Sequence, residues 1–333
     1  MRIFSIPSQN KNNQLSLKGI DGKNILIVKR SQGVGDVIMV TPVLHRLRQL
    51  NPDAYIIFQT RYPELLRYNE DVDKIIENNE NYHTYKTIDL NWTVETDEIG
   101  KGAIPFKQYV GVDRVRSFYN HAGIPWDGKP QFQYKVVGSE KLRAENKWKE
   151  LEGERRIVCA FFCQSYLRCY HLPHIIRVIE YLLEQQYAVM ILGTDYWETQ
   201  SKDFIPKKFR DRLRGLEDRK FVNLMSKTEL REASALINSS DLLITVDSGL
   251  LHIAGALGKK TLALFGNMPP ELRIKYYPKC EAIYNEGLPC VPCYNHCYPT
   301  DTMLGCLSEG QISAPCMVSI LPKMVMAKIE EIL

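Results

Sequence analysis

The sequence predicts an α/β protein made of two Rossmann-like, doubly wound domains. Short apolar runs rich in β-branched residues alternate with amphipathic stretches, and residues 25–28 and 242–246 are the clearest examples. Glycine-containing turns follow both runs and lead into helical patterns, which is the order of a βαβ unit. At 333 residues the chain suggests about two domains. We expect a first domain over residues 1–150 and a second over residues 151–333, with the boundary in the charged stretch 138–156.

The composition is that of an ordinary globular enzyme. Hydrophobic residues make up 44% of the chain and charged residues 25%. The net charge of +4 is too mild to predict a nucleic-acid partner, and it is compatible with an anionic substrate or with peripheral membrane contact at most. Residues 1–18 are polar and lack the apolar core of a signal peptide, and no apolar run approaches the roughly 20 residues of a membrane span. We therefore expect a cytoplasmic protein.

The stretch 241–266 carries the clearest βαβ pattern. A buried strand at 242–246 is broken by Asp247, Ser248 and Gly249, and a helix with apolar residues at helical spacing follows. Gly258 ends this helix as a left-handed cap, and a second strand at 261–265 stops at Gly266.

The turn at the start of that helix predicts an anion site. A helix N-terminus offers unpaired N–H groups and partial positive charge, and Gly249 has no side chain to keep a phosphate away. Asp247 would lie at the carboxyl end of a strand, where open α/β sheets bind ligands. Since its charge would repel a phosphate, we expect it to face a neutral sugar or ribose hydroxyl. The same residues also fit an ordinary turn with Ser248 as the helix N-cap.

A second glycine-containing loop follows the strand at 25–28. Gly33 and Gly35 form a tight turn, Asp36 follows directly, and a helix with Pro42 near its first turn comes next. The third glycine of a dinucleotide fingerprint is missing, because Val40 occupies its position, and no phosphate-binding Gly-Lys-Ser/Thr is present. Asp36 fits a general base at a loop apex or a simple helix cap.

These two loops together resemble glycosyltransferase family 9, the heptosyltransferases of bacterial surface glycans. The resemblance is carried by Val-Asp-Ser-Gly-Leu-Leu-His at 246–252, Ala-Leu-Gly at 256–258, Leu-Phe-Gly at 264–266, and Gly-x-Gly-Asp at 33–36 followed by Thr-Pro at 41–42. It implies the GT-B arrangement, in which two Rossmann-like domains face a cleft. It also implies inverting transfer of heptose from ADP-heptose to a hydroxyl of a glycan, lipid-linked or protein acceptor, with Asp36 as the base.

The resemblance also implies the residues that hold the donor. The loop after the strand at 156–162 contacts the donor phosphates in the family through a basic residue before a Trp-Pro pair. Here Leu172-Pro173 replaces that pair, so Arg168 is our candidate for the missing cation, with an ordinary surface arginine as the alternative. The helix dipole and basic side chains could neutralise the negative charge of the leaving diphosphate. We therefore expect no catalytic metal. The candidate donor-site residues are Gly33, Gly35, Gln164, Ser165, Arg168, Gly193, Thr194, Met225, Asp247, Ser248, Gly249, Leu250, His252 and Gly266.

The segment 280–316 is rich in cysteine. Thiolates in a Cys-x-x-Cys turn can reach one tetrahedral ion, so a structural zinc or iron site is one interpretation; reduced thiols and disulfides are the others. The candidate ligands are Cys290, Cys293, Cys297 and Cys306, with Cys316 or His296 as substitutes. Iron is also suggested by protein-modifying heptosyltransferases that resemble the family. A final helix at 317–333 is expected to pack back on the first domain, as in related transferases.

Two other functions fit the same sequence. A non-catalytic nucleotide-sugar-binding protein would use the same C-terminal loop without needing Asp36. A nicotinamide-dependent oxidoreductase would need a full Gly-x-Gly-x-x-Gly and an acid about 20 residues further on, and neither is convincing here.

Overall fold

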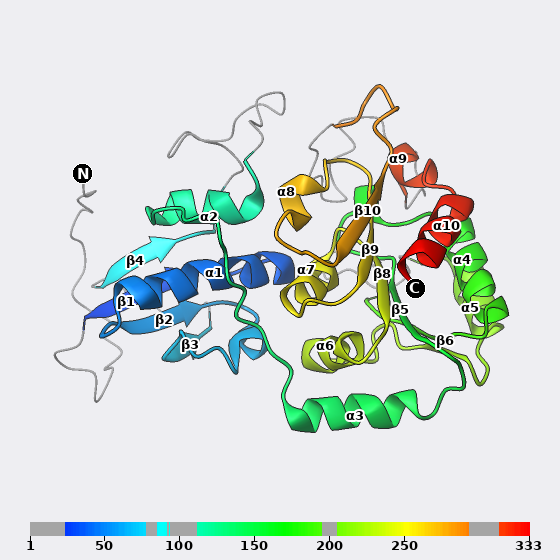
Figure 1. The fold of residues 1–333 in the computed structure, drawn as a ribbon, viewed down its shortest axis with the longest axis horizontal. Coiled ribbons are helices and arrows are strands. Elements are labelled where there is room, and N and C mark those ends of the chain that lie inside the picture. Colours follow the sequence, from blue (N-terminus) through cyan, green and yellow to red (C-terminus); the bar gives the residue numbers. More distant parts are fainter. Residues whose placement is uncertain (1–23, 78–84, 92, 94–111, 195–204, 293–312) are drawn as a thin grey trace.

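The computed structural model of the 333-residue chain describes residues 24–77, 85–91, 93, 112–194, 205–292 and 313–333. These residues form two α/β units side by side, each with its own parallel sheet (Figure 1). None of the helices within the described ranges combines the length and the apolar character that crossing a membrane requires.

The first unit holds a four-stranded sheet in the order β3-β2-β1-β4, and each of its strand pairs is parallel. Its strands and helices are β1 (Ile25–Lys29), α1 (Val34–Leu50), β2 (Tyr55–Gln59), η1 (Pro63–Leu66), β3 (Lys74–Ile76), β4 (Lys86–Asp89) and α2 (Arg114–Ala122). The apolar runs that predict β1 and β2 are almost fully buried, which confirms both strands.

Helix α1 starts earlier than its sequence suggests. It begins at Val34, so Pro42 lies in its middle rather than near its first turn. Proline removes one backbone N–H from the helical ladder, and here the hydroxyl of Thr41 donates to the carbonyl of Ile38, the acceptor that this N–H would have used, at 2.8 Å. The hydroxyl of Tyr119 on α2 donates to the carbonyl of Pro42 at 3.0 Å and fastens the two helices together.

The second unit holds a six-stranded parallel sheet in the order β10-β9-β8-β5-β6-β7. Its strands are β5 (Arg156–Ala160), β6 (Ala188–Ile191), β7 (Phe221–Asn223), β8 (Leu242–Val246), β9 (Thr261–Phe265) and β10 (Cys280–Tyr284). Its helices are α3 (Gly138–Trp148), η3 (Tyr166–Arg168), α4 (Leu172–Glu184), α5 (Lys207–Arg214), α6 (Leu230–Asn238), α7 (Gly249–Ala256), α8 (Glu271–Ile274), α9 (Pro315–Val318) and α10 (Pro322–Ile332). The predicted β8–α7–β9 unit is confirmed, and Gly258 has the expected left-handed φ of 64°.

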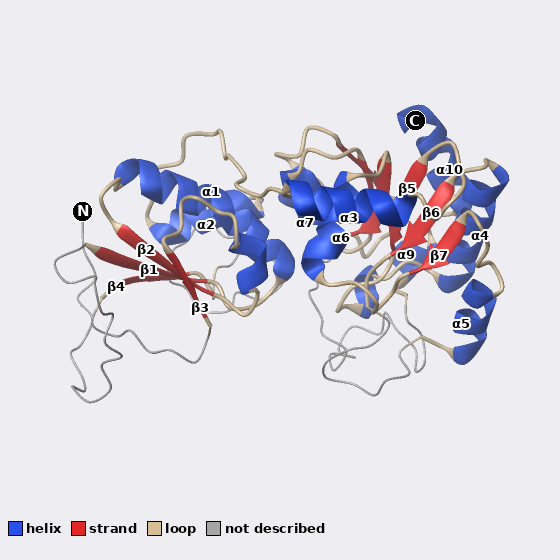
Figure 2. Ribbon diagram, turned by 90° about the horizontal axis from the view of Figure 1, so that it is seen from below, coloured by secondary structure: helices blue, strands red, loops and turns tan. Residues whose placement is uncertain are grey.

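Alternate residues of the second sheet pack on opposite layers, as the period of a strand requires. Val158 and Leu243 face α6 and α7, whereas Ile157 and Ile244 face α4, α5 and α10. Figure 2 shows the helices on the two sides of these strands. Both faces are therefore covered, as in a doubly wound fold.

Two elements lie elsewhere than the sequence analysis placed them. Helix α10 packs on α4, where the hydroxyl of Tyr181 donates to Glu330 at 2.8 Å, so the described final helix belongs to the second unit and the expected return to the first domain was wrong. Its apolar side is buried by Val325 and Ile329 in the second unit's core. Helix α3 packs on α6, and we therefore propose that the boundary lies in the connecting segment 124–137, ahead of Gly138.

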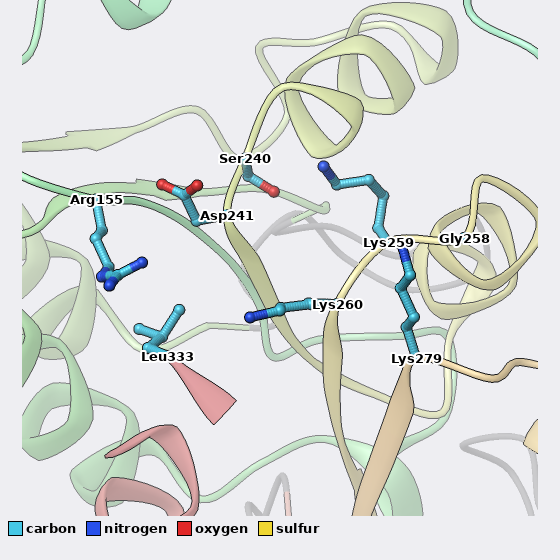
Figure 3. A pocket seen from close by; sticks show the side chains of 8 residues that line it. All are labelled: Arg155, Ser240, Asp241, Gly258, Lys259, Lys260, Lys279 and Leu333. Carbon is cyan, nitrogen blue, oxygen red and sulfur yellow. The ribbon is translucent and has the colours of Figure 1, made fainter. Parts of the chain in front are cut away.

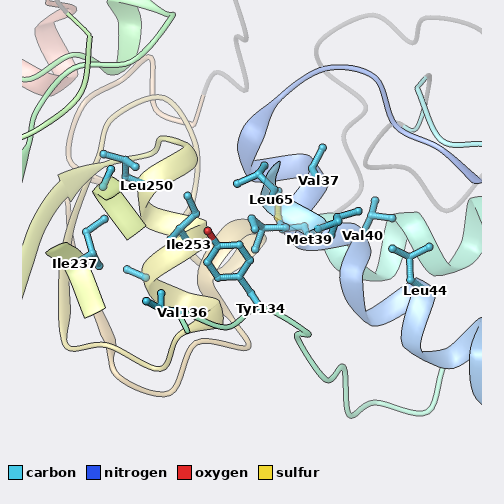
Figure 4. Packing of buried hydrophobic residues seen from close by; sticks show 14 of the residues in the cluster. Val37, Met39, Val40, Leu44, Leu65, Tyr134, Val136, Ile237, Leu250 and Ile253 are labelled. Atoms are coloured by element: carbon cyan, nitrogen blue, oxygen red, sulfur yellow. The ribbon is translucent and has the colours of Figure 1, made fainter. Parts of the chain in front are cut away.

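One apolar cluster runs through both units. It joins residues of α1, including Val40 and Leu44, to residues of α6 and α7, including Leu250 and Ile253. Tyr134 from the connecting segment lies between the two sets, and Val136 lies on the side of α6 and α7 (Figure 4). The hydroxyls of Tyr134 and Ser234 are 2.6 Å apart, so this buried crossing is hydrogen-bonded as well as packed.

Candidate active site

Each sheet has one point where the strand order reverses, and both candidate loops lie at these points. In the second sheet β5 lies beside β8, so the loop before α4 and the turn before α7 flank one crevice. In the first sheet β1 lies beside β4, so the loop before α1 adjoins the chain after Asp89. Ligands of open α/β sheets bind outside the carboxyl ends of strands at such switch points.

Asp36 is held between two arginines in the first unit. One carboxylate oxygen pairs with Arg30, at the end of β1, and the other accepts from Nε of Arg114 at 2.9 Å. Arg30 in turn donates to the carbonyls of Leu90 and Asn91 at 3.0 and 2.8 Å, which ties the β1 loop to the β4 loop. Burial disfavours the charged carboxylate, but the cations of Arg114 and Arg30 outweigh it and hold the pKa of Asp36 well below its usual range.

Asp36 is not the cap of α1. The helix N-cap is Gly33, whose φ of 81° suits glycine, and Asp36 lies in the first helical turn with its carboxylate turned to the arginines. A Cβ on Gly33 would come within 2.7 Å of the Asp36 carboxylate. Glycine at this position therefore gives the carboxylate its room, and the cap interpretation of Asp36 was wrong.

Asp247 lies in a second cluster of opposite charges. Its side chain is 3% exposed, and Nη1 of Arg168 donates to it at 3.1 Å. Nε2 of His252 is 3.6 Å from one carboxylate oxygen, and Nε of Arg273 is 3.9 Å from the other. Burial opposes ionisation here too, but the positive charges of Arg168 and Arg273 hold the pKa of Asp247 far below its usual range. Asp247 is expected to face a neutral hydroxyl of a ligand; its protein neighbours in the structure include the cations Arg168 and Arg273.

The two clusters meet across the contact between the units. A Cβ on Gly35 would overlap the ring of His252, and a Cβ on Gly249 would lie 2.7 Å from the Val34 side chain. Helices α1 and α7 thus meet end to end at two glycines, with no room for a methyl group at either. Arg273 lowers the pKa of both Asp36 and Asp247, which places both carboxylates within the field of one cation.

We predict that Gly35→Ala destabilises the protein by about 1–3 kcal/mol, the usual cost of overpacking, and, as the two loops separate, lowers the transfer activity that the sequence predicts. Urea unfolding measures the first effect and a turnover assay the second. Gly138→Ala is the matched control, because no atom lies within 4 Å of a Cβ there. Equal stability of the two variants would contradict the close packing of Gly35 on His252.

The remaining candidate residues have varied positions. Ser248 is the N-cap of α7 by position, but its hydroxyl lies 3.2 Å from that of Thr245 and makes no capping hydrogen bond. Gln164 is exposed, while Ser165 is buried in the loop with Arg168. Gly193, with a φ of 114°, and exposed Thr194 follow β6. Three others pack in the interior: Met225 and Leu250 in apolar clusters, and Gly266 beneath Cys316 and Met317.

Comparison with known proteins identifies the family. The sequence profile described as "Glycosyltransferase family 9 (heptosyltransferase)" matches residues 103–302, more than half of the chain. The chain belongs to glycosyltransferase family 9. Lipooligosaccharide heptosyltransferase 2 of Haemophilus influenzae is 33% identical over 140 residues, which cover 40% of this chain and 38% of that protein. The match therefore spans well under half of this curated relative.

Solved structures of the family share the fold. The E. coli ADP-heptose lps heptosyltransferase II superposes with a TM-score of 0.62 at 17% identity, covering 93% of this chain and 98% of that one. The dodecameric iron-containing heptosyltransferase TibC, in complex with ADP-D-beta-D-heptose, superposes with a TM-score of 0.62 at 15% identity, covering 93% and 76%. These likenesses confirm the predicted GT-B fold.

Four cationic or hydrogen-bonding residues of this family 9 site were missed by sequence analysis: Arg30, Arg114, Arg273 and Tyr277. Tyr277 places its hydroxyl 3.0 Å from Nδ1 of His252 and so orients the ring toward Asp247. Arg30 directly precedes the glycine loop in the sequence. That position was the one feature that could have predicted it as a site residue. The others come from distant segments of the chain.

The predicted metal site of this family 9 protein lies mostly outside the described residues, which exclude Cys293, His296, Cys297 and Cys306. Cys290 is exposed, and Cys316 is buried against Gly266. Within the described residues, no group of three or more potential ligands comes together.

A basic pocket of about 240 Å³ lies away from this site, at the amino ends of β8, β9 and β10 (Figure 3). It is lined by Arg155, Lys259, Lys260 and Lys279, together with Ser240, Asp241, Gly258 and Leu333. Asp247 and Gly266 follow the carboxyl ends of β8 and β9, so the pocket and the candidate site occupy opposite edges of the sheet.

Proposed function

We propose that this glycosyltransferase moves heptose from ADP-heptose to an acceptor hydroxyl with inversion at the anomeric carbon. The observation that carries the proposal is the meeting of the Asp36 and Asp247 clusters at the contact between two switch points. A donor bound on one unit would then have its reactive carbon near a carboxylate of the other. The heptosyltransferase relatives support the choice of sugar, and the ADP-heptose bound to TibC supports the choice of nucleotide.

The second unit would hold the donor. Arg168 has a buried Nε without a hydrogen-bond partner, and its guanidinium suits a diphosphate. Arg273 and the N-terminus of α7 would add positive charge as the diphosphate leaves. In this arrangement the phosphate oxygens compete with Asp247 for Arg168, and the carboxylate released can accept from sugar hydroxyls.

The first unit would bind the acceptor, with Asp36 as proton acceptor. Its lowered pKa makes it a weak base, which suits a late proton transfer. In an oxocarbenium-like transition state the attacking hydroxyl becomes strongly acidic once its oxygen has bonded to the anomeric carbon. A carboxylate that stays ionised at neutral pH can then take the proton within hydrogen-bond reach.

We propose a saccharide of a bacterial surface glycan as the acceptor, since the curated relatives are named for lipooligosaccharide and lipopolysaccharide. Such an acceptor would bring the protein to a membrane surface at most peripherally. Mass spectrometry of truncated glycan acceptors incubated with ADP-heptose tests the assignment: a product heavier by one heptose supports it. Hydrolysis of ADP-heptose without an acceptor product would oppose it.

We predict that Arg168→Gln weakens ADP binding about tenfold or more, because a charge-assisted hydrogen bond to phosphate contributes about 1.5–3 kcal/mol. Isothermal titration with ADP measures the effect, and NAD in place of ADP tests the oxidoreductase alternative. Arg177→Gln is the control, since the Arg177 side chain is 74% exposed on α4. ADP affinity that is equal in both variants would remove Arg168 from the donor site.

A further inference from the structure

Two cysteines face each other in the loop between β5 and α4. The loop is closed at its base by the N–H of Tyr170, which donates to the carbonyl of Phe161 at 3.0 Å. Within it, the N–H of Arg168 donates to the carbonyl of Ser165 at 3.0 Å. Cys163 enters this loop and Cys169 leaves it, so the turn brings two residues six positions apart back together.

The two sulfur atoms converge on the same backbone groups. The thiol of Cys163 donates to the carbonyl of Ser165 at 3.3 Å, and the thiol of Cys169 lies 3.5 Å from that carbonyl. Sγ of Cys169 also lies 3.5 Å from both the N–H and the carbonyl oxygen of Cys163. Two sulfur atoms that contact the same carbonyl oxygen lie close to each other, as a disulfide requires.

The two thiols have different surroundings. Cys163 is partly exposed, whereas Cys169 is fully buried. Burial and Asp247 disfavour a thiolate at Cys163, but the neighbouring Cys169 thiol and the charge of Arg168 lower its pKa to about 7. Burial raises the pKa of Cys169. Cys163 thus has the properties of an attacking thiolate, and Cys169 those of a resolving thiol.

We propose that Cys163 and Cys169 are a redox-active dithiol, which a hydroperoxide converts to a disulfide in the loop that carries Arg168. The Cys163 thiolate attacks one peroxide oxygen; an S–O bond forms, the O–O bond breaks, and the other oxygen leaves as an alcohol or water after taking a proton. The Cys169 thiol then attacks the sulfenic sulfur; the S–S bond forms and water leaves. Two electrons pass from the thiols to the peroxide.

The link to activity rests on the proposed function. Arg168 and Ser165 lie between the two cysteines, and Arg168 is the proposed phosphate ligand. A bound diphosphate would cover the loop and place negative charge beside Cys163, so ADP should slow oxidation severalfold. The disulfide itself requires no donor, so the two ideas can fail separately.

Peptide mapping of the full chain after hydrogen peroxide treatment tests the dithiol. We expect a Cys163–Cys169 disulfide that a thiol reductant removes. Cys169→Ser should instead accumulate a sulfenic acid at Cys163, trapped by dimedone, and Cys163→Ser should leave Cys169 unmodified. Cys280→Ser should behave as the native protein, since Cys280 lies on β10. Arg168→Gln should slow oxidation at neutral pH by about three- to tenfold, because the thiolate loses its neighbouring cation.

Absence of the Cys163–Cys169 peptide, or equal dimedone labelling of the two single variants, would overturn the dithiol. Formation of the disulfide at a rate that ADP leaves unchanged would keep the dithiol and remove its link to the donor site.

Discussion

Asp36→Asn is expected to lower kcat by about 10²- to 10⁴-fold while ADP-heptose affinity stays close to that of the native protein. Asparagine keeps the size of the side chain but cannot take the acceptor proton. Donor binding should survive because the proposed phosphate ligands, Arg168 and Arg273, lie on the second unit. Turnover and titration calorimetry on the same preparation measure the two effects.

The controls for Asp36→Asn address its structural part. The substitution also leaves Arg30 and Arg114 without their carboxylate, so urea unfolding must show that the variant is folded at the assay temperature. Asp53→Asn makes the same chemical change at an exposed position and should keep full activity. Native turnover in a folded Asp36→Asn protein would reject Asp36 as the base and leave it only a structural role as the partner of two arginines.

The pH profile gives an independent check on Asp36. Since the arginines hold its pKa well below the usual carboxyl range, Asp36 should remain ionised from about pH 5 to about pH 8. An acidic limb of the rate profile in that window would then belong to another group. Because the folded protein lowers the pKa of Asp36, the contribution of this residue to the free energy of unfolding is complete above the ordinary carboxyl pKa. That contribution is lost as the pH falls through the pKa of the folded state.

Glu140→Gln should destabilise the fold by about 3–5 kcal/mol, the cost of leaving one partner of a buried ion pair. Glu140 on α3 accepts from Nε of Arg231 on α6 at 2.9 Å, and the two side chains are 4% and 8% exposed. The second carboxylate oxygen accepts from the N–H of Val137 at 3.0 Å, at the start of α3. The neutral amide would leave a buried guanidinium without its countercharge.

A neighbouring pair between the same two helices supplies the control. Lys147 and Glu232 are 30% and 36% exposed, so Glu232→Gln should cost no more than about 1 kcal/mol. Burial disfavours the charge on Glu140, but Arg231 and the Val137 N–H lower its pKa below 4.5. The difference in the free energy of unfolding between the native protein and Glu140→Gln should therefore be complete above pH 4.5. It should shrink as the pH falls through the lowered pKa. Equal losses in both variants would contradict the burial argument.

Local patterns were enough to predict the elements but not the charges around them. The apolar runs of the sequence predict β1, β5, β8 and β9, and Gly33, Gly249 and Gly258 mark turns. The arginines around Asp36 could not be predicted in this way. Arg114 lies 78 residues from Asp36, and long-range pairs between common surface residue types leave no periodic signal.

The environment of Asp247 was missed for a related reason. Its position after a strand is a local property, and it was predicted correctly. The arginines beside it come from the β5 loop and from α8, which only the strand order β9-β8-β5 brings together. Gly35 and Gly249 were predicted as part of the donor site. In the structure each of them packs against a side chain of the other unit. The position of Pro42 in the helix was predicted wrongly, because proline is typical of a helix's first turn. The hydrogen bond from Thr41 that accommodates it in mid-helix is seen only in the structure.

The apolar cluster shared by α1, Tyr134 and α7 makes the two halves of the chain dependent on each other for folding. Cutting the chain at the connecting segment would leave each fragment with an exposed apolar surface that the other fragment normally covers. We expect neither fragment to stay soluble alone. Heat or urea should consequently melt the protein in one cooperative step, although it contains two sheets.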